Sequence, residues 1–127
     1  MTAEVRFPHH ASSGGQVLLA YSDTGRLDRV LDAPLRRWTQ HTVTAATKLV
    51  RVLAQVRENG VAISREQYQV GRADVAAPIF ADNGVAVASL EIVVSAGEPL
   101  RQHVLAVRAA AAEVSSALRA TMPRRRS

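Results

Sequence analysis

The sequence predicts a small α+β domain in which an antiparallel β-hairpin packs against helices. Two β-prone runs, residues 74–80 and 85–94, are joined by Ala-Asp-Asn-Gly, and an Asn-Gly step between such runs indicates a hairpin. Two other stretches, residues 49–56 and 100–118, carry apolar residues at the spacing of an amphipathic helix. Locally paired strands and separate covering helices are typical of the α+β class.

A strand at residues 3–7 is expected first, followed by a helix that Ser12 or Ser13 would cap. The first turn of this helix contains Gly14 and Gly15, although glycine destabilises a helix. We therefore expect another group to approach this backbone closely. The N–H groups at a helix start suit an anion or a carbonyl oxygen. The alternative is a loose loop that precedes a shorter helix.

Two more helices and a short strand are expected before the hairpin. Capping side chains mark the starts of these helices, namely Asp23 or Thr24 and then Thr44. The second helix would end at Gly60, because glycine is common directly after the last helical residue. A strand is expected at residues 61–64, and a final helix would run from Pro99 to Met122.

Composition excludes several classes of function. The 127 residues fit one domain, and the absence of cysteine excludes disulfides, thiolate metal sites and cysteine nucleophiles. No apolar run reaches the roughly 20 residues of a membrane span, and the N-terminal residues lack a signal-peptide core. We therefore expect a cytoplasmic protein without membrane association.

The basic character of the chain lies largely in its last residues. The net charge is +5, and Arg124–Arg126 supply three of these charges, which leaves +2 for the rest of the chain. That is an ordinary value, and it predicts no basic surface for nucleic acid. We expect residues 1–122 to form the domain and residues 123–127 to form a disordered basic tail.

Two carboxylates, Asp74 and Glu91, lie in the most apolar part of the chain. With a four-residue turn, Phe80 would pair with Val85 and Asp74 would fall opposite Glu91. A two-residue turn shifts the pairing but leaves both carboxylates on one face of the hairpin. Like charges that face each other across strands destabilise a sheet. The pair is therefore expected to have a use or to reach water.

Three kinds of chemistry would use this pair. An amine, a guanidinium or a hydroxyl-rich ligand would satisfy both charges. With His10, or His9, the pair could instead ligate a divalent metal. Acid–base catalysis is the third, because facing residues lie about 5 Å apart, although a small domain with few aromatic residues argues against it. The alternative without a ligand is exposure to solvent or protonation of one acid.

Four short motifs follow one another between residues 7 and 79, ahead of the hairpin turn and the closing helix that extends the pattern to about residue 118. They are FPHHASSGGQVLLA at 7–20, PLRRWT at 34–39, VRENGVA at 56–62, and Glu66 with Gly71 and VAAPI at 66–79. In order and spacing they resemble the C-terminal domain of the IclR family of bacterial transcription regulators. The resemblance implies a GAF-like antiparallel sheet packed with helices. In that family DNA binds to an N-terminal winged helix-turn-helix, and we expect this chain to lack that part together with the first strands of the family's sheet.

The resemblance also implies an effector pocket between the sheet and the first helix. Carried over position by position, its lining would be Phe7, Ser13, Gly14, Ser64, Asp74, Glu91 and Val93. The two carboxylates stand where the family has small Cys, Ser or hydroxyl residues, and Gln16 replaces a usual lysine. The ligand implied is therefore a cation, a polyol or a metal rather than a simple organic acid. Glu66 is expected to make a local structural hydrogen bond.

The function implied is that of a small-molecule sensor without enzymatic activity, in a homo-oligomer or paired with related regulators. An effector would change the arrangement of subunits and thereby operator binding. No cofactor is implied beyond the divalent metal considered above. One alternative is a stand-alone protein that pairs with full-length regulators through a sheet edge or the last helix. The other is a truncated reading frame without function.

Overall fold

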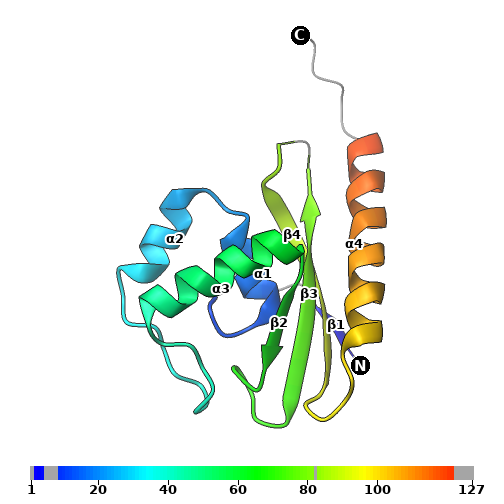
Figure 1. Ribbon diagram of the computed structural model, residues 1–127. Coiled ribbons are helices and arrows are strands. Elements are labelled where there is room, and N and C mark those ends of the chain that lie inside the picture. Colours follow the sequence, from blue (N-terminus) through cyan, green and yellow to red (C-terminus); the bar gives the residue numbers. More distant parts are fainter. Residues whose placement is uncertain (1, 5–8, 82, 122–127) are drawn as a thin grey trace.

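The computed structural model describes residues 2–4, 9–81 and 83–121, and over these residues the chain is an α+β domain (Figure 1). In chain order the elements are β1 (Thr2–Glu4), α1 (Ser13–Ala20), α2 (Thr24–Leu31), α3 (Ala46–Asn59), β2 (Ala62–Arg65), β3 (Arg72–Phe80), β4 (Ala86–Ser95) and α4 (Arg101–Thr121). The predicted order of helices, strand, hairpin and closing helix is confirmed. No described helix is long and apolar enough to cross a membrane.

The described strands form one antiparallel sheet in the order β1-β4-β3-β2. The long helix α4 covers one face of this sheet, and α1 and α3 lie on the other (Figure 1). Strand β3 is buried on both faces: Ala76 belongs to the core below α1 and α3, whereas Val75 and Ala77 belong to the core below α4. A strand covered on both sides reads as a nearly continuous apolar run, as β3 does.

The register of the hairpin differs from the expected one. Asp74 pairs with Val93, and Glu91 pairs with Ala76, so the two acids are diagonal neighbours and not direct partners. The connection between the strands covers residues 81–85, and an irregularity follows Ile79 in the ladder. Both carboxylates nevertheless lie on one face, because a shift of two residues preserves the alternation of side chains.

Three of the expected helix ends are confirmed. The Ser12 side chain accepts the Gly15 N–H at 3.1 Å and Asp23 accepts the Arg26 N–H at 3.1 Å, as N-terminal caps do. Gly60 ends α3 in the left-handed conformation, with φ of 72°, and its N–H bonds to the carbonyl oxygen of the last turn.

Other expected ends were wrong by a few residues. Helix α3 begins one residue later than a Thr44 cap would require, and Ala45 at its N-cap makes no side-chain bond. The Thr44 hydroxyl instead accepts a hydrogen bond from Arg37 at 3.2 Å. Helix α4 starts at Arg101 and not at Pro99. Strand β1 is Thr2–Glu4, and the rest of its expected range, like Met122 and the tail, lies outside the described residues.

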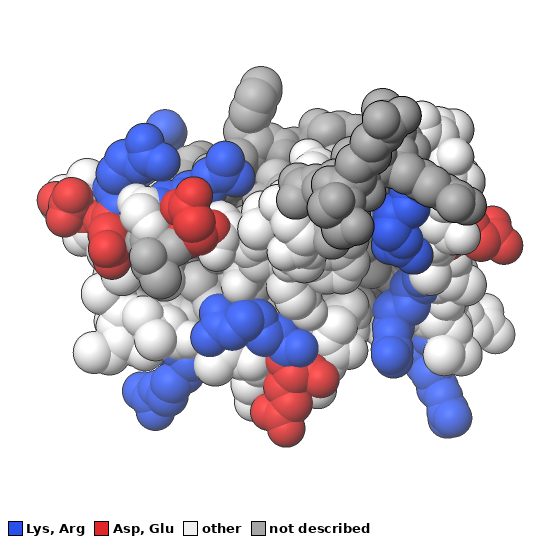
Figure 2. Space-filling model, turned by 90° about the horizontal axis from the view of Figure 1, so that it is seen from above, with Lys and Arg blue, Asp and Glu red and all other residues white. Residues whose placement is uncertain are grey.

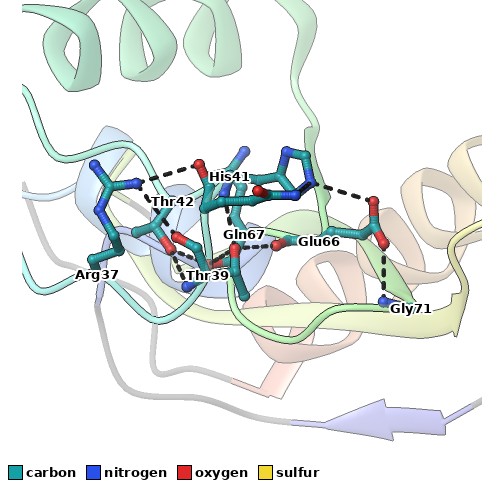
Figure 3. A network of polar contacts seen from close by, with 8 residues as sticks. Arg37, Thr39, His41, Thr42, Glu66, Gln67 and Gly71 are labelled. Carbon is teal, nitrogen blue, oxygen red and sulfur yellow. Dashed lines mark hydrogen bonds and ion pairs between the residues drawn. The ribbon is translucent and has the colours of Figure 1, made fainter.

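Polar contacts hold the loop before α3 against the loop between β2 and β3 (Figure 3). Thr39 and Thr42 donate their hydroxyls to the backbone carbonyls of Glu66 and Gln67, both at 2.5 Å. The Glu66 side chain accepts the Gly71 N–H at 3.0 Å, which confirms its expected local structural role. The Gln67 side chain of the same loop accepts a hydrogen bond from Gln16, on α1, at 3.1 Å.

Candidate functional site

The candidate site lies where α1 begins, over the face of the sheet opposite α4. Two serines followed by two glycines, residues 12–15, build this helix start, and the Ser12 cap sets its direction. The first N–H groups of a helix have no partner within it, and they carry the positive end of the helix dipole. They therefore require acceptors, and strands β3 and β4 supply them.

Asp74, on β3, takes the first of these N–H groups. Its Oδ1 accepts the Ser13 N–H at 2.6 Å, and the side chain is 8% exposed. Burial raises the pKa of Asp74 to about 7, because a carboxylate loses hydration there. The Ser13 hydrogen bonds oppose this rise, whereas the charge of Glu91 and a hydrogen bond with it add to it.

Glu91, on β4, takes the second N–H group. Its Oε1 accepts the Gly14 N–H at 3.0 Å and the Ser13 hydroxyl at 3.1 Å, and the residue is 1% exposed. A carboxylate with two donors at a helix start is well placed electrostatically. The structure therefore gives a physical reason for two acids in an apolar hairpin: both serve as acceptors at the start of α1.

The two glycines permit this close approach, as expected. A Cβ atom at Gly14 would lie 3.0 Å from the Ser89 Oγ and 3.3 Å from the Glu91 Oε1. A Cβ atom at Gly15 would lie 2.1 Å from the backbone oxygen of His9, which is far inside contact distance. The backbone of α1 therefore lies directly against side chains of β4 on one side and against the backbone of the preceding loop on the other.

Ser64 and Val93 flank Asp74 on the neighbouring strands. Ser64 pairs with Asp74 from β2, and Val93 pairs with it from β4, so the three residues form one row across the sheet. The Ser64 hydroxyl donates to the Ala11 carbonyl at 3.0 Å, just before α1. Of the seven predicted site residues, the structure brings together Ser13, Gly14, Ser64, Asp74, Glu91 and Val93. The seventh, Phe7, lies outside the described residues.

The histidines do not join the carboxylates. The His10 Nε2 donates to the Arg36 carbonyl at 2.7 Å, and the His9 Nδ1 accepts the Ala11 N–H at 3.0 Å. Both rings pack against Trp38, with ring centres 5.2 and 5.4 Å apart. Among the described residues, no group of three or more His, Asp, Glu or Cys side chains is placed to hold a metal. The predicted metal set of His10, Asp74 and Glu91 is thus not assembled.

The sequence did not indicate the polar contacts that Ser89 and Gln16 make in this region. Ser89 is fully buried against Gly14, and alternation along β4 places it on the same face as Glu91, a signal that could have found it. Gln16 is also fully buried and donates to the His10 carbonyl and to the Gln67 side chain. The contact with Gln67 joins segments 51 residues apart, which no local pattern indicates.

A comparison of the chain with protein families identifies the family to which it belongs. Residues 4–118 match the family model described as the C-terminal domain of the bacterial transcriptional regulator IclR. The chain belongs to the IclR family. The predicted resemblance is therefore confirmed, and the match covers most of the chain, including every described residue of the site.

Curated relatives in the IclR family are longer regulators. The Pca operon regulatory protein of Acinetobacter baylyi is 36% identical over 105 residues, which are 79% of this chain and 38% of that protein. The regulator KdgR of Escherichia coli is 32% identical over 116 residues, which are 87% of this chain and 44% of that protein. The chain thus spans less than half the length of these two relatives.

Solved structures of IclR-family proteins share the fold. An IclR homologue from Microbacterium hydrocarbonoxydans, in complex with 4-hydroxybenzoate, matches with a TM-score of 0.84 and 33% identity, over 91% of this chain and 48% of that one. The C-terminal domain of E. coli KdgR matches with a TM-score of 0.79 and 30% identity, over 87% of this chain and 70% of that one. The predicted α+β architecture is therefore that of IclR C-terminal domains.

Proposed function

We propose that this chain is the effector-sensing domain of an IclR-type transcription regulator and that it has no enzymatic activity. The observation that carries the proposal is the convergence of one helix start and three strands on two buried carboxylates. Buried ionisable groups with a raised pKa, such as Asp74, are concentrated at binding and catalytic sites. The curated relatives are regulators and a similar structure holds a small molecule, which supports binding.

The ligand class follows from the charges of the site. The homologue from M. hydrocarbonoxydans holds 4-hydroxybenzoate, an organic acid. Here Asp74 and Glu91 would repel a second carboxylate at the same place, whereas an amine, a guanidinium or a hydroxyl-rich molecule would bond to them. Asp74 is the more exposed of the two acids and is the natural first contact. A divalent metal is a second candidate, with both acids as ligands.

In the whole regulator, the ligand would act by shifting populations. A molecule that binds one arrangement of subunits better than another favours that arrangement by its difference in affinity. Ligand binding between α1 and the sheet would then alter operator binding by a separate DNA-binding domain. This mechanism requires a homo-oligomer or a pairing with related regulators.

Thermal unfolding in the presence of candidate ligands tests the proposal. The panel contains small amines, guanidinium, polyols, divalent metals and organic acids, among them 4-hydroxybenzoate. At least one cation or polyol is expected to raise the midpoint of wild type in a saturable way, and Asp74→Asn should abolish that rise. Asp28→Asn, an exposed change on α2, is the matched control. A panel without any stabilising cation, polyol or metal would refute the proposed ligand class.

A further inference from the structure

The N–H groups of the first turn of α1 are all taken by groups of this chain. The Ser13 N–H bonds to Asp74, the Gly14 N–H to Glu91, and the Gly15 N–H to Ser12. The next N–H, that of Gln16, makes an ordinary helical bond to the Ser12 carbonyl. No amide of this helix start is left for an external anion, although helix starts are otherwise natural anion sites.

An acidic ligand could enter only by displacing one of the two carboxylates. Glu91 is 1% exposed and has no way to turn into water without moving α1 or β4. Displacing it would leave a buried charge without its donors, which is strongly unfavourable. The occupied N–H groups at the start of α1 therefore disfavour binding of a carboxylate ligand there, in addition to any repulsion between its charge and the two acids.

A second observation independently indicates a position made for an anion beside Gly14. The Ser89 hydroxyl is fully buried and has no hydrogen-bond partner among the described residues. It lies against Gly14, 3.0 Å from where a Cβ would stand, and the Glu91 Oε1 lies 3.3 Å from the same point. The Ser13 hydroxyl already donates to Glu91 there. The Glu91 carboxylate thus accepts two hydrogen bonds from the start of α1, and the Ser89 hydroxyl lies close by on β4, the strand that carries Glu91.

We propose that the Glu91 carboxylate is a built-in occupant of an anion-binding position at the start of α1, and that it determines the charge of the ligand this domain accepts. The inference builds on the proposed sensing function and names the residue that excludes organic acids from it. Its direct consequence is that shortening Glu91 uncovers a site for a small carboxylate. Glu91→Ala removes a group with the size and charge of acetate.

Chemical rescue by acetate tests this assignment. Glu91→Ala is expected to unfold at a lower temperature than wild type, and acetate should raise its midpoint in a saturable way. Acetamide, which has the same shape without the charge, and sodium chloride at equal ionic strength should have no comparable effect. Wild type and Glu113→Ala, a change of an exposed acid on α4, should not respond to acetate either.

Two outcomes would overturn the assignment. One is a folded Glu91→Ala protein that acetate does not stabilise, and the other is an equal acetate response in wild type. If Glu91→Ala does not fold alone, refolding in acetate replaces the midpoint, and no recovery of folded protein at any acetate concentration counts against the assignment. Glu91→Gln keeps the volume of the side chain, so it should fold and ignore acetate. These results do not depend on finding a natural ligand, so they separate this inference from the proposed function.

Discussion

Gly14 and Gly15 let α1 lie with its backbone directly on its neighbours. On one side the neighbours are the Glu91 and Ser89 side chains, and on the other side the neighbour is the backbone of His9. A side chain at either glycine would push the helix away from the acids that bond to it. Glycine in a helix is about 1 kcal/mol less favourable than alanine, but at these two positions only glycine leaves room for the neighbouring atoms.

Gly14→Ala is expected to destabilise the protein by about 1–3 kcal/mol, the usual range for an overpacked core. Gly15→Ala should be more harmful, since its Cβ would lie 2.1 Å from a backbone oxygen that cannot turn away. Denaturant unfolding of both variants measures these effects. Gly25→Ala, in the first turn of α2 with its nearest atom at 3.4 Å, is the control and should be neutral or slightly stabilising. Equal effects at all three positions would contradict the packing described here.

Asp74 should make stability depend on pH in the direction opposite to that of an ordinary paired carboxylate. Its pKa is raised to about 7 in the folded protein, from an ordinary value of 3.8. Below the lower value the group is protonated in both states, so the free energy of unfolding does not change with pH there and is at its highest with respect to this group. As pH rises between the two values, the unfolded chain releases its proton first, so the folded state loses stability until the folded pKa is passed.

The comparison of wild type with Asp74→Asn isolates this effect, because asparagine does not titrate and keeps an oxygen for the Ser13 N–H. One pKa unit corresponds to about 1.4 kcal/mol, so the wild-type free energy of unfolding should fall relative to Asp74→Asn by roughly 4 kcal/mol between about pH 4 and pH 7. Urea unfolding at several pH values provides the measurement. A difference that is constant with pH, or that grows as pH rises, would show that Asp74 is not buried in this way.

At the level of elements, a partly buried polar contact joins α4 to the sheet beside the apolar core below this helix. The Phe80 N–H, at the end of β3, donates to the Ser115 hydroxyl at 2.9 Å. Strand β2 pairs with β3 only as far as Ala76, so within the described part of the chain no strand flanks the last residues of β3 on that side. Ser115 therefore supplies an acceptor that the sheet does not.

Ser115→Ala should destabilise the protein by about 1–3 kcal/mol, since it leaves the Phe80 N–H without an acceptor. Ser116→Ala, one residue along on the exposed surface of α4, is the matched control and should be neutral or slightly stabilising. Thermal unfolding of the two variants is sufficient to compare them. Similar stabilities would mean that the Phe80 N–H finds another acceptor.

Local patterns predicted those elements whose cause is local. The Asn-Gly hairpin, the Ser12 and Asp23 caps and the Gly60 end depend on residues within a few positions of one another. The common face of Asp74 and Glu91 followed from alternation alone. The exact pairing did not, because the length of the connection and the irregularity after Ile79 shift it by two residues.

Tertiary contacts outside the local patterns explain the predictions that were wrong. Arg37 takes up the Thr44 hydroxyl that was expected to cap α3, and the Arg36 carbonyl takes up the His10 ring that was expected near the acids. The bond from His10 joins residues 26 positions apart, and the bond from Ser13 to Asp74 spans 61. Such pairings depend on how the loops fold over the sheet, which no short window of sequence determines.

At the scale of the whole molecule, the charges on the face shown in Figure 2 do not indicate a ligand. On the face shown in Figure 2, acidic and basic side chains mix over α2 and α3, and basic ones line the side of α4. Exposed charges are screened beyond about 10 Å at 0.1 M salt, whereas buried ones are screened much less. Ligand preference is therefore expected to come from the Asp74 and Glu91 pair and to change little with ionic strength.

Helix α1, whose start bonds to Asp74 and Glu91, connects the site to the loops beside it. Helix α1 lies between the sheet and α3, and Gln16 bonds to Gln67 in the loop that Thr39 and Thr42 hold. A ligand that altered the bonds at the start of α1 would thus also act on these loops. In the proposed mechanism, an effect of binding on the helix start would therefore extend to these loops.

The amide proton of Ser13, followed by NMR through a pH titration of 15N-labelled protein, tests the central claim most directly. The claim is that α1 begins on two buried carboxylates, so this amide proton should titrate with a midpoint at about pH 7, and Asp74→Asn should remove the titration. The Ser13 and Gly14 amides should also exchange slowly with water. An amide that does not titrate, or that titrates near the ordinary carboxyl value of 3.8, would contradict the account.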